Sequence, residues 1–512
     1  MKSFQDNVYG NFDYPAEFES LIRSYPVQRL GRIKQLGLLE KVYPSGVGSR
    51  LSHSLGVMFL MKEFFNEIWS KSEELKEEYS LRRNQDKKDS KGYEYWVNVA
   101  SLSGLLHDLG QGPFSHAFEK IIKPIKHDKH MTLAVIKNNL MNHEEIKKTK
   151  GKDDWSKDLS RQLEDVLNIF DLVYNNNEKI LDNCTSDNEK WAVSIISRLL
   201  SGAFDVDKLD YLMRDRVHIG FGYNAVDFDW LLKNIYFKFK EDSYKDSYIY
   251  FKEDACTALD EFIFSRISLY WKCIYHRKVR LFELMLIKLL SFLMEEKKYE
   301  VLFRNPKFNG CLSFFNTCNQ MKDDHNQGKN IEVDAFLKLD DSVVLEIIKN
   351  IRTLCESSWE GVEIQEIEKK LLNALTLPFV DSKSMYHCLY EVYSETDKVT
   401  DEMREVIRQK VFSYYAIPSE SKLFPYFFFG DQPELKGHIT KEKQDIKIER
   451  TQLPIGEIRD EDKYFDLLEK SQISQLFSGN GQLVHRYYIL DDSDDRKLLN
   501  SIKQDILKIR KD

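Results

Sequence analysis

Apolar residues in the first half of the chain recur at the i, i+3, i+4, i+7 spacing of an amphipathic helix. This pattern predicts helices over residues 16–24, 53–70, 94–109, 192–201 and 207–215. The alternation typical of strands is scarce, and we expect strands only at 247–253 and 483–490. Because 42% of the 512 residues are hydrophobic, the chain can bury a large core. The sequence therefore predicts a mainly α-helical fold.

Charge is dense but nearly balanced, with 75 Lys and Arg against 83 Asp and Glu and a net charge of −8. This balance argues against a general coat for nucleic acid, although a local basic groove remains compatible with it. The seven cysteines are scattered and form no C-x-x-C pair, which is typical of reduced thiols. We find neither an 18-residue apolar run nor a signal-peptide pattern at the N-terminus. We therefore expect a soluble, cytoplasmic protein that makes no membrane contact.

A change in composition near residue 300 predicts two lobes. We expect a catalytic domain over 1–300 and a smaller, helical C-terminal lobe with minor β structure over 301–512, with an oligomerisation or regulatory role. Two strongly charged segments, 71–92 and 143–158, are expected to be solvated surface insertions.

The helix predicted over 94–109 ends in the sequence HDLGQGP, in which two glycines and a proline follow His107 and Asp108. Glycine favours a helix C-terminus, and proline favours the first turn of a following helix. Adjacent side chains on a regular helix diverge, so a break at this point lets the two neighbours converge. Imidazole nitrogens and carboxylate oxygens are good ligands for divalent metals. In the next helix His116 and Glu119 lie at i, i+3 on one face, which indicates a metal site with an acid–base pair beside it.

A His-Asp pair alone is a weak indication, because about one is expected by chance in a chain with 12 histidines. Two further candidate ligands strengthen it: His53 begins one predicted helix and Asp207 lies on another. On the helix of Asp207, three polar side chains fall at i, i+3, i+7 and form a stripe on one side. These residues are Lys208, Tyr211 and Asp215.

Several sequence motifs occur in the order of a known family. They read PVQRLGRIKQLG, SRLSHSLGV, LLHDLGQGPFSH, DVDKLDYLMRD and SRISLYWKCIYHRK, within about residues 5–285. With them the chain resembles the HD-domain phosphohydrolases and, among these, the deoxynucleoside triphosphate (dNTP) triphosphohydrolases. The resemblance implies a helical HD fold that hydrolyses a dNTP to a deoxynucleoside and inorganic triphosphate.

The resemblance also implies one divalent cation per site, whether Mn, Mg, Fe, Zn or Ni. Its ligands would be His53, His107, Asp108 and Asp207. His116 would serve the proton transfers of hydrolysis, oriented by Glu119. Either His127 or His130 would assist it, because the local alignment leaves both open.

A further set of residues is implied to surround the nucleotide. Arg50, Lys208 and Arg266 would hold the triphosphate. Gln35, Leu36, Tyr211 and Asp215 would surround the deoxyribose. Gln111 stands where the family usually has a histidine, which puts the rate or the substrate in doubt. Tyr275 would replace a family tyrosine after a one-residue shift, because the ungapped match places Ile274 there.

Two other function classes stay open. One is an HD phosphodiesterase or nuclease that acts on cyclic nucleotides or single-stranded nucleic acid. The other is a nucleotide sensor with a weakened catalytic site, for which Gln111 is the only indication. The resemblance implies a homo-oligomer, and nucleic-acid binding is a further candidate interaction. The resemblance fits either a role in nucleotide metabolism or one in antiviral defence.

Overall fold

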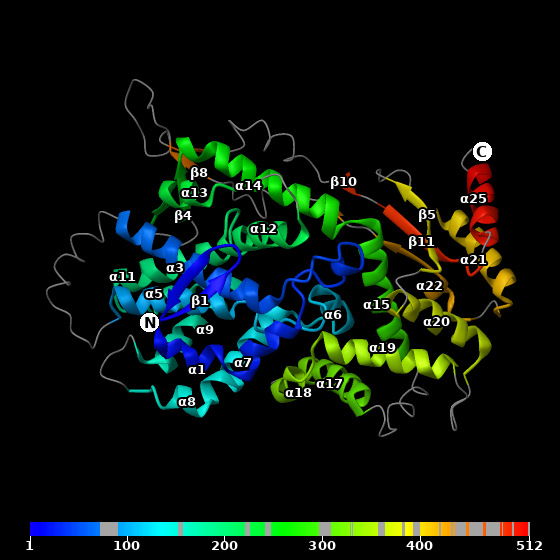
Figure 1. Cartoon of the computed structure of the whole chain (residues 1–512), viewed down its shortest axis with the longest axis horizontal. Coiled ribbons are helices and arrows are strands. Elements are labelled where there is room, and N and C mark those ends of the chain that lie inside the picture. The colour runs from blue at the N-terminus through cyan, green and yellow to red at the C-terminus, as the bar shows by residue number, and fades with distance from the viewer. Residues whose placement is uncertain are drawn as a thin grey trace.

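In the computed structural model, the described residues are 1–71, 91–151, 157–220, 226–240, 247–295, 309–327, 329, 331–356, 364–380, 384–392, 400–418, 421–431, 434–435, 447–449, 464–466, 482–483, 485–493 and 496–509. The expected mainly α-helical fold is confirmed (Figure 1).

The α-helices of the first 300 residues are α1 (Glu19–Ile22), α2 (Tyr25–Arg29), α3 (Arg50–Lys71), α5 (Tyr93–Leu106), α6 (His116–Ile121), α7 (Leu133–Asn138), α8 (Glu144–Lys147), α9 (Leu159–Asn175), α10 (Lys179–Asp182), α11 (Asp187–Leu200), α12 (Val206–Ile219), α13 (Phe228–Asn234), α14 (Cys256–Leu269) and α15 (Arg277–Glu295). They are followed by α17 (Asn309–Asn326), α18 (Val333–Leu337), α19 (Asp341–Glu356), α20 (Glu366–Val380), α21 (Asp401–Tyr415), α22 (Phe424–Phe427) and α25 (Lys497–Ile509). Short 3-10 helices are η1 (Ala16–Phe18), η2 (Leu30–Arg32), η3 (Leu39–Lys41), η5 (Leu140–Asn142) and η8 (Glu253–Ala255), and two π-helices are η4 (His127–Thr132) and η9 (Tyr270–Ile274).

Among the described residues, the strands form small sheets of two to four strands. Their bounds are β1 (Lys2–Asp6), β2 (Gly10–Tyr14), β3 (Ile235–Lys238), β4 (Tyr248–Lys252), β5 (Tyr386–Val392), β6 (Phe428–Asp431), β7 (Glu434–Leu435), β8 (Lys447–Glu449), β9 (Tyr464–Asp466), β10 (Gln482–Leu483) and β11 (His485–Leu490). Within the described residues, β1 and β2 make a hairpin, the order β5-β11-β6 makes a three-stranded sheet, and β3-β4-β8-β9 makes a four-stranded one. Strands β4 and β8 pair in parallel although about 200 residues separate them, so the C-terminal half returns to the N-terminal one.

The predicted strands at 247–253 and 483–490 are confirmed as β4 and β11. The helix predicted over 94–109 is wrong at its end, because α5 stops at Leu106. The backbone leaves the helix there to pack against η4: the amide of Gly110 donates to Oγ1 of Thr132 at 2.9 Å. A Cβ at Gly110 would lie 2.3 Å from the carbonyl oxygen of His127, so only glycine fits this approach.

Several expectations about the organisation of the chain fall on residues that the structure does not describe. The predicted boundary near 300 lies within 296–308, and most of the charged segment 71–92 lies within 72–90, both outside the described residues. The other charged segment, 143–158, includes α8, while 152–156 are outside the described residues. The division into domains 1–300 and 301–512 therefore stays a prediction.

Helices α3, α5 and α12 form the centre of the first half, with α3 packed along α5 and crossed by α12. The crossing of α3 and α5 is close, since a Cβ at Gly104 would lie 2.7 Å from the backbone oxygen of Val57. Where α3 meets α12, a Cβ at Gly56 would lie 1.9 Å from Oδ1 of Asp210. Two glycines thus let three helices approach until their polar side chains meet.

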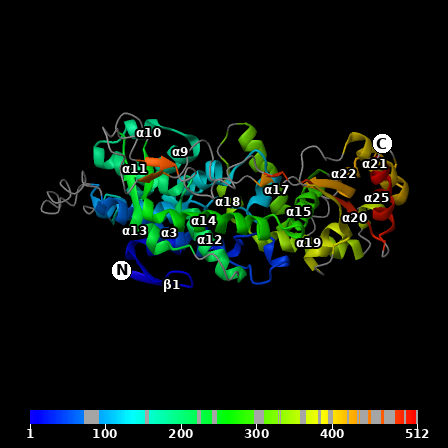
Figure 2. The same cartoon turned by 90° about the horizontal axis from the view of Figure 1, so that it is seen from above.

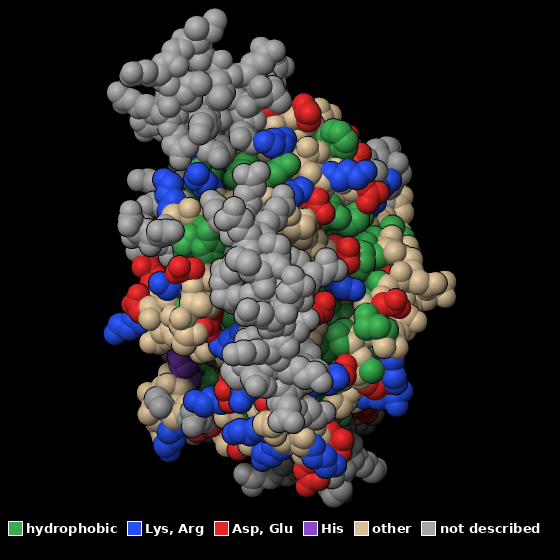
Figure 3. Space-filling model, turned by 90° about the vertical axis from the view of Figure 1, so that its left-hand side faces the viewer, with side chains coloured by type: hydrophobic (Ala, Val, Ile, Leu, Met, Phe, Trp, Pro, Cys, Tyr) green, Lys and Arg blue, Asp and Glu red, His purple; other side chains and the backbone are tan. Residues whose placement is uncertain are grey.

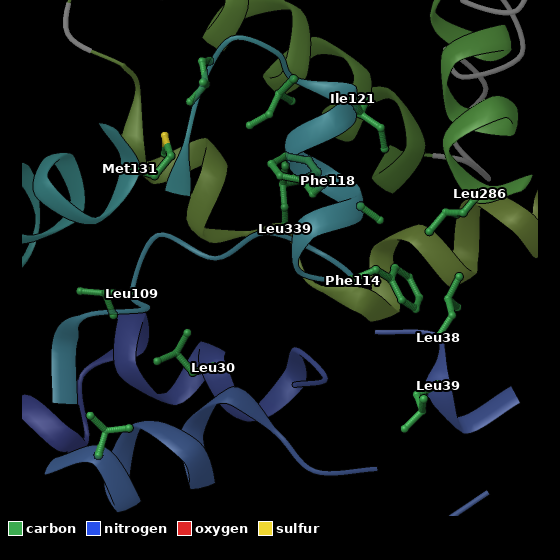
Figure 4. Close-up of a cluster of buried hydrophobic side chains, with 14 of the residues drawn as sticks. Leu30, Leu38, Leu39, Leu109, Phe114, Phe118, Ile121, Met131, Leu286 and Leu339 are labelled. Carbon is green, nitrogen blue, oxygen red and sulfur yellow. The ribbon is translucent and has the colours of Figure 1, made fainter. Parts of the chain in front are cut away.

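Helices from the second half cover the short helix α6 (Figure 1). The ring of Phe118 lies 6.1 Å from that of Phe314 and 6.3 Å from that of Phe336. Figure 4 shows Phe118 and Leu339 facing each other in this apolar cluster, with Phe114 beside Leu38. Apolar contact therefore joins α6 to the region around α18 and α19.

Seen from above, the chain extends from the N-terminal hairpin at one end to α21 and α25 at the other (Figure 2). On the face shown in Figure 3, the described Lys and Arg side chains are mixed with Asp and Glu. In the described part of the chain, no helix has both the length and the apolar character needed to cross a membrane.

Candidate metal centre

Three side chains from separate elements meet where α3, α5 and α12 come together. His53 lies in the first turn of α3, His107 follows α5, and Asp207 lies in the first turn of α12. The Nε2 atoms of His53 and His107 lie 3.0 and 3.6 Å from the same Oδ1 of Asp207. The potential ligand atoms of these three residues all lie within 4.8 Å of one another. The structure thus brings together three of the four predicted metal ligands.

The opposite nitrogens of the two imidazoles are already engaged. Nδ1 of His107 donates to the carbonyl oxygen of Gly104 at 2.8 Å, and Nδ1 of His53 donates to Oδ2 of Asp210 at 2.7 Å. A neutral imidazole that donates through Nδ1 has its lone pair on Nε2. Both Nε2 atoms are buried and have no hydrogen-bond partner. Two buried lone pairs directed at one carboxylate oxygen fit a divalent cation placed among them.

Asp108 borders the same position and can serve as the fourth ligand. Its Oδ2 lies 3.5 Å from Nε2 of His107 and 3.8 Å from Nε2 of His53. Arg50 donates to this oxygen at 2.5 Å, and Gln111 donates to Oδ1 at 3.3 Å. Burial alone would raise the pKa of Asp108, but Arg50 and His107 lower it well below its usual range. Asp108 is therefore an ionised carboxylate held in a fixed orientation.

The shifted pKa values of the side chains at the centre indicate that a positive charge is favoured there. Burial would raise the pKa of Asp207, but the imidazoles of His107 and His53 beside it lower it below its usual value. Burial would lower the pKa of His53, but Asp207 and Asp210 raise it to about 10. The carboxylates of Asp207 and Asp210 thus favour a cation beside them, which protons on the imidazoles or a divalent metal can supply.

A second group, formed by His116, Glu119 and His127, lies beside the first. Nδ1 of His127 is hydrogen-bonded to Oε1 of Glu119, and its Nε2 lies 3.5 Å from Oδ1 of Asp108. Nδ1 of His116 lies 3.8 Å from Oε2 of Glu119, and the His116 side chain is 64% exposed. Burial would lower the pKa of His127, but Asp108 and Glu119 raise it to about 9. His127 is thus a partly buried cation between two carboxylates, and His116 is accessible to a substrate.

The structure places His127, rather than His130, against Glu119. His130 turns away, and its ring lies 4.9 Å from that of His325. Both histidines lie on the π-helix η4, which ends at Thr132; this residue accepts from Gly110 and donates to the carbonyl oxygen of His107 at 3.2 Å. One wide helical turn therefore carries His127 and also supports the turn of His107.

The polar stripe of α12 extends away from the metal centre. Nζ of Lys208 is hydrogen-bonded to Asp205 and donates to the carbonyl oxygen of Gly202 at 2.8 Å. The guanidinium of Arg266 on α14 lies 5.6 Å from the ring centre of Tyr270. Tyr211 lies close to Arg266, and burial raises the pKa of its hydroxyl well above the usual value. Lys208 and Arg266, which were predicted to bind the triphosphate, thus lie in the same region as Tyr211, which was predicted to contact the sugar.

Two predicted sugar-contacting residues have a buried oxygen without a hydrogen-bond partner. They are Asp215, through Oδ2, and Gln35, through Oε1. Burial is the main cause that raises the pKa of Asp215 to about 7. Oxygens of this kind can accept a hydrogen bond from a hydroxyl group.

Three other predicted residues border this region. Leu36 is partly buried and packs on the core, next to Gln35. Arg50 is engaged within the protein, since it also donates to Oγ of Ser115 at 3.0 Å and to the carbonyl oxygen of Gln35 at 3.2 Å. The ring of Tyr275 lies 5.4 Å from that of Tyr270, while Arg486 donates to its carbonyl oxygen at 2.6 Å.

Sequence reasoning missed the group that supports His53. Asp210 accepts from His53, from the hydroxyl of Tyr9 at 2.8 Å, and from Nε of Arg214 at 3.0 Å. Arg214 also donates to Oδ2 of Asp6 at 2.8 Å. Asp210 and Arg214 were visible as an acid and a base at i, i+4 on the helix of Asp207. No sequence pattern indicated that Tyr9 and Asp6, from the N-terminal hairpin, also belong to this group.

Comparison with known proteins agrees with this geometry. Residues 50–212 match the family model described as HD domain. The chain is 23% identical over 92% of its length to the uncharacterized protein YwfO of Bacillus subtilis, covering 88% of that protein. It is 25% identical to the protein named deoxynucleoside triphosphate triphosphohydrolase SAMHD1 homolog in Dictyostelium discoideum, covering 78% of this chain and 62% of that one. The Gallus gallus protein named deoxynucleoside triphosphate triphosphohydrolase SAMHD1 is also 25% identical, over 69% of this chain and 52% of its own length.

Solved structures show the same fold. A phosphohydrolase from Bacteroides thetaiotaomicron superposes with a TM-score of 0.66 at 21% identity, covering 96% of this chain and all of the other. The resemblance to the HD-domain proteins seen in the sequence motifs is confirmed. The chain spans little more than half the length of the animal and amoebal relatives that carry the dNTP name.

Proposed function

We propose that this chain, whose residues 50–212 are an HD domain, is a divalent-metal-dependent dNTP triphosphohydrolase. The observation that carries the proposal is the convergence of two buried, unpartnered imidazole nitrogens on Asp207. The match to the HD domain of the phosphohydrolase superfamily supports a hydrolase in general. The choice of dNTPs rests on the relatives of that name and on the side chains around the centre.

His53, His107, Asp108 and Asp207 would hold the metal. When bound, a divalent cation supplies Lewis-acid chemistry, because it neutralises phosphate oxygens and activates water. Mn²⁺, Mg²⁺, Fe²⁺, Zn²⁺ and Ni²⁺ all accept imidazole and carboxylate ligands, so the identity of the ion stays open.

Proton transfer would fall to the second group. The leaving 5′ oxygen of the deoxynucleoside must gain a proton when its bond to the α-phosphate breaks. His116 is exposed and lies beside Glu119, so it can deliver that proton. His127 is held between Glu119 and Asp108, where it fixes the position of both carboxylates.

The residues around the centre fit a deoxynucleotide. A triphosphate carries about four negative charges, which Lys208 and Arg266 can offset once they leave Asp205 and Tyr270. The unpartnered oxygens of Asp215 and Gln35 can accept a hydrogen bond from the 3′-hydroxyl. Tyr211 and Leu36 would then pack on the ring where a 2′-hydroxyl would otherwise lie.

The test is incubation of the purified protein with each dNTP, ribonucleotide, cyclic nucleotide and labelled oligonucleotide, in Mn²⁺, Mg²⁺ or Fe²⁺. We expect deoxynucleoside and inorganic triphosphate in equal amounts, and an Asp207→Ala variant that forms neither. Mononucleotides from oligonucleotides would instead indicate a nuclease, and tight binding without turnover a sensor.

We further propose a homo-oligomer in the cytoplasm, where dNTPs are made and used. The support for the oligomer is the family resemblance of the sequence motifs. Light scattering of the purified protein, with and without dNTP, would measure the oligomeric state. Nucleic-acid binding and a role in antiviral defence remain further proposals, which binding assays and infection assays would test.

A further inference from the structure

The turn between the metal ligands and His116 has an unusual backbone. Phe114 and Ser115 both have positive φ, at 54° and 55°. Such angles are rare for side chains other than glycine, asparagine and aspartate, and a bulky residue keeps them only when its surroundings enforce them. His116 is the first residue of the next helix, α6. The contacts that enforce these two φ angles therefore also fix the position at which α6 begins.

A carboxylate from the second half of the chain binds this turn. Asp341, the first residue of α19, is 4% exposed. Its Oδ1 accepts from the amide of Phe114 at 2.6 Å, and its Oδ2 accepts from the amide of Lys34 at 3.0 Å. These two amides belong to segments that lie 227 and 307 residues away from Asp341 in the sequence.

Both segments lead directly to the proposed active site. Ser115 follows Phe114, and its hydroxyl donates to the carbonyl oxygen of Lys34 at 2.9 Å. The same hydroxyl accepts from Nε of Arg50, whose Nη1 donates to Asp108. A continuous series of hydrogen bonds therefore runs from Asp341 to a predicted metal ligand.

A second contact from the same region supports the other end of the turn. The buried Arg29 donates through Nε to the carbonyl oxygen of Leu339 and through Nη1 to that of Gln111, both at 2.8 Å. Its guanidinium also lies 4.4 Å from the ring centre of Phe336. Phe336 and Leu339 thus hold the turn at Gln111 through Arg29, and Asp341 holds it directly at Phe114.

We infer that Asp341 is a positioning residue of the active site. Through the amides of Phe114 and Lys34 it sets the orientation of Arg50 and Asp108 and the start of the helix that carries His116. The inference rests on the proposed function for its catalytic consequence, and it makes the region around α19 part of the active-site architecture.

The experiment compares the wild-type full chain with Asp341→Asn and Asp341→Ala. An asparagine oxygen can accept one of the two amides and alanine neither, so we expect kcat to fall in the order Asp, Asn, Ala. For Asp341→Ala we expect a loss of about tenfold, the lower range for removing a group that orients a metal ligand. Hydrogen exchange of the Lys34 and Phe114 amides should accelerate at least about tenfold, because their shared acceptor is lost.

Two matched controls separate positioning from stability. Asp340→Asn removes an acid next to Asp341 that pairs with the partly exposed Arg32, at 2.6 Å, and leaves the two amides bonded. Ile347→Val removes a buried methyl group six residues after Asp341 on α19 and lowers stability. Both variants should keep kcat within about twofold of wild type, assayed well below the lowest melting temperature.

Unchanged exchange at both amides in Asp341→Ala would overturn the inference, as would faster exchange with an unchanged kcat. If the wild-type protein hydrolyses no dNTP, the proposed function fails. The affinity for Mn²⁺ then tests whether Asp341 is a positioning residue. A drop of about tenfold in that affinity in Asp341→Ala would support positioning of Asp108, and wild-type affinity would contradict it.

Discussion

Asp210 is the residue on which the orientation of His53 depends. It is buried, bonds Nδ1 of His53, and is itself held by Arg214 and Tyr9. Groups that orient a metal-binding histidine typically contribute 10- to 100-fold in metal affinity. We expect Asp210→Ala to weaken Mn²⁺ binding by about that factor, measured by calorimetric titration. Asp6→Asn is the control: it removes another acid bonded to Arg214, and it should change the affinity less than about threefold.

The raised pKa of Asp341 predicts how the stability of the protein depends on pH. Burial is the main cause that raises its pKa from 3.8 to about 6, although the amides of Phe114 and Lys34 lower it. The folded protein therefore holds this proton more tightly than the unfolded chain does. The contribution of Asp341 to stability is highest below about pH 4 and declines as the pH rises to about 6.

The predicted measurement compares urea unfolding of wild type and Asp341→Asn between pH 4 and 6.5. Because 1.36 kcal/mol corresponds to one pKa unit and this range covers most of the titration, wild type should lose about 2 kcal/mol relative to the variant. The comparison cancels the other carboxylates, such as Asp108 and Asp207, whose lowered pKa values act in the opposite direction. A constant difference between the two proteins would contradict the expectation.

Sequence reasoning at this scale found residues whose chemistry is visible in short motifs. His107 and Asp108 stand at a helix break, and His53 and Asp207 stand at helix starts, so their types and positions pointed to a metal. Asp341 carries no such mark, because its partners Phe114 and Lys34 act through backbone amides. A backbone amide is the same in every residue but proline, so the sequence could not single these out.

At the scale of elements, the close crossing of α3 and α12 decides whether the metal ligands can meet. A Cβ at Gly56 would lie 1.9 Å from Asp210 and 2.2 Å from Arg214, both on α12. We expect Gly56→Ala to lower the free energy of unfolding by about 1–3 kcal/mol or more, because the helices must separate. Chemical denaturation measures this change, and Mn²⁺ affinity should fall with it.

Gly31→Ala is the matched substitution. There a Cβ would meet the Leu51 side chain at 3.5 Å, an ordinary contact, and φ is not positive. The change should be neutral or stabilise by about 0.4–1 kcal/mol, because alanine reduces the freedom of the unfolded chain. If both alanine variants lost the same stability, the crossing of α3 and α12 would not be the cause.

Helices were predictable where the apolar period was sustained, as in α3 and α12, and two strands were predictable from alternation. The predicted end of α5 was wrong because Leu106 is followed by a turn that packs on η4, a contact between segments more than 20 residues apart. The π-helix η4 itself was not foreseen, since a single extra residue in a helical turn leaves the apolar pattern nearly unchanged.

At the scale of the whole molecule, the proposed site joins elements that are distant in the chain. Its ligands come from α3, from the turn after α5 and from α12, and α19 contacts that turn from the second half. A ligand that binds only the folded arrangement stabilises all of these elements together. Binding of the metal should therefore appear in the unfolding of the chain as a whole.

We expect Mn²⁺ at 100 times its Kd to stabilise the protein by about 2.7 kcal/mol. For cooperative unfolding of a chain of 512 residues, with an unfolding entropy of about 2.1 cal/mol/K per residue, the transition midpoint should rise by about 2.5 °C, measured by scanning calorimetry. EDTA should reverse the shift, and Asp207→Ala should show none, because it lacks the carboxylate on which both imidazoles converge. A full shift in Asp207→Ala would mean that Mn²⁺ binds elsewhere, and the metal centre would then have to be sought outside the meeting point of α3, α5 and α12.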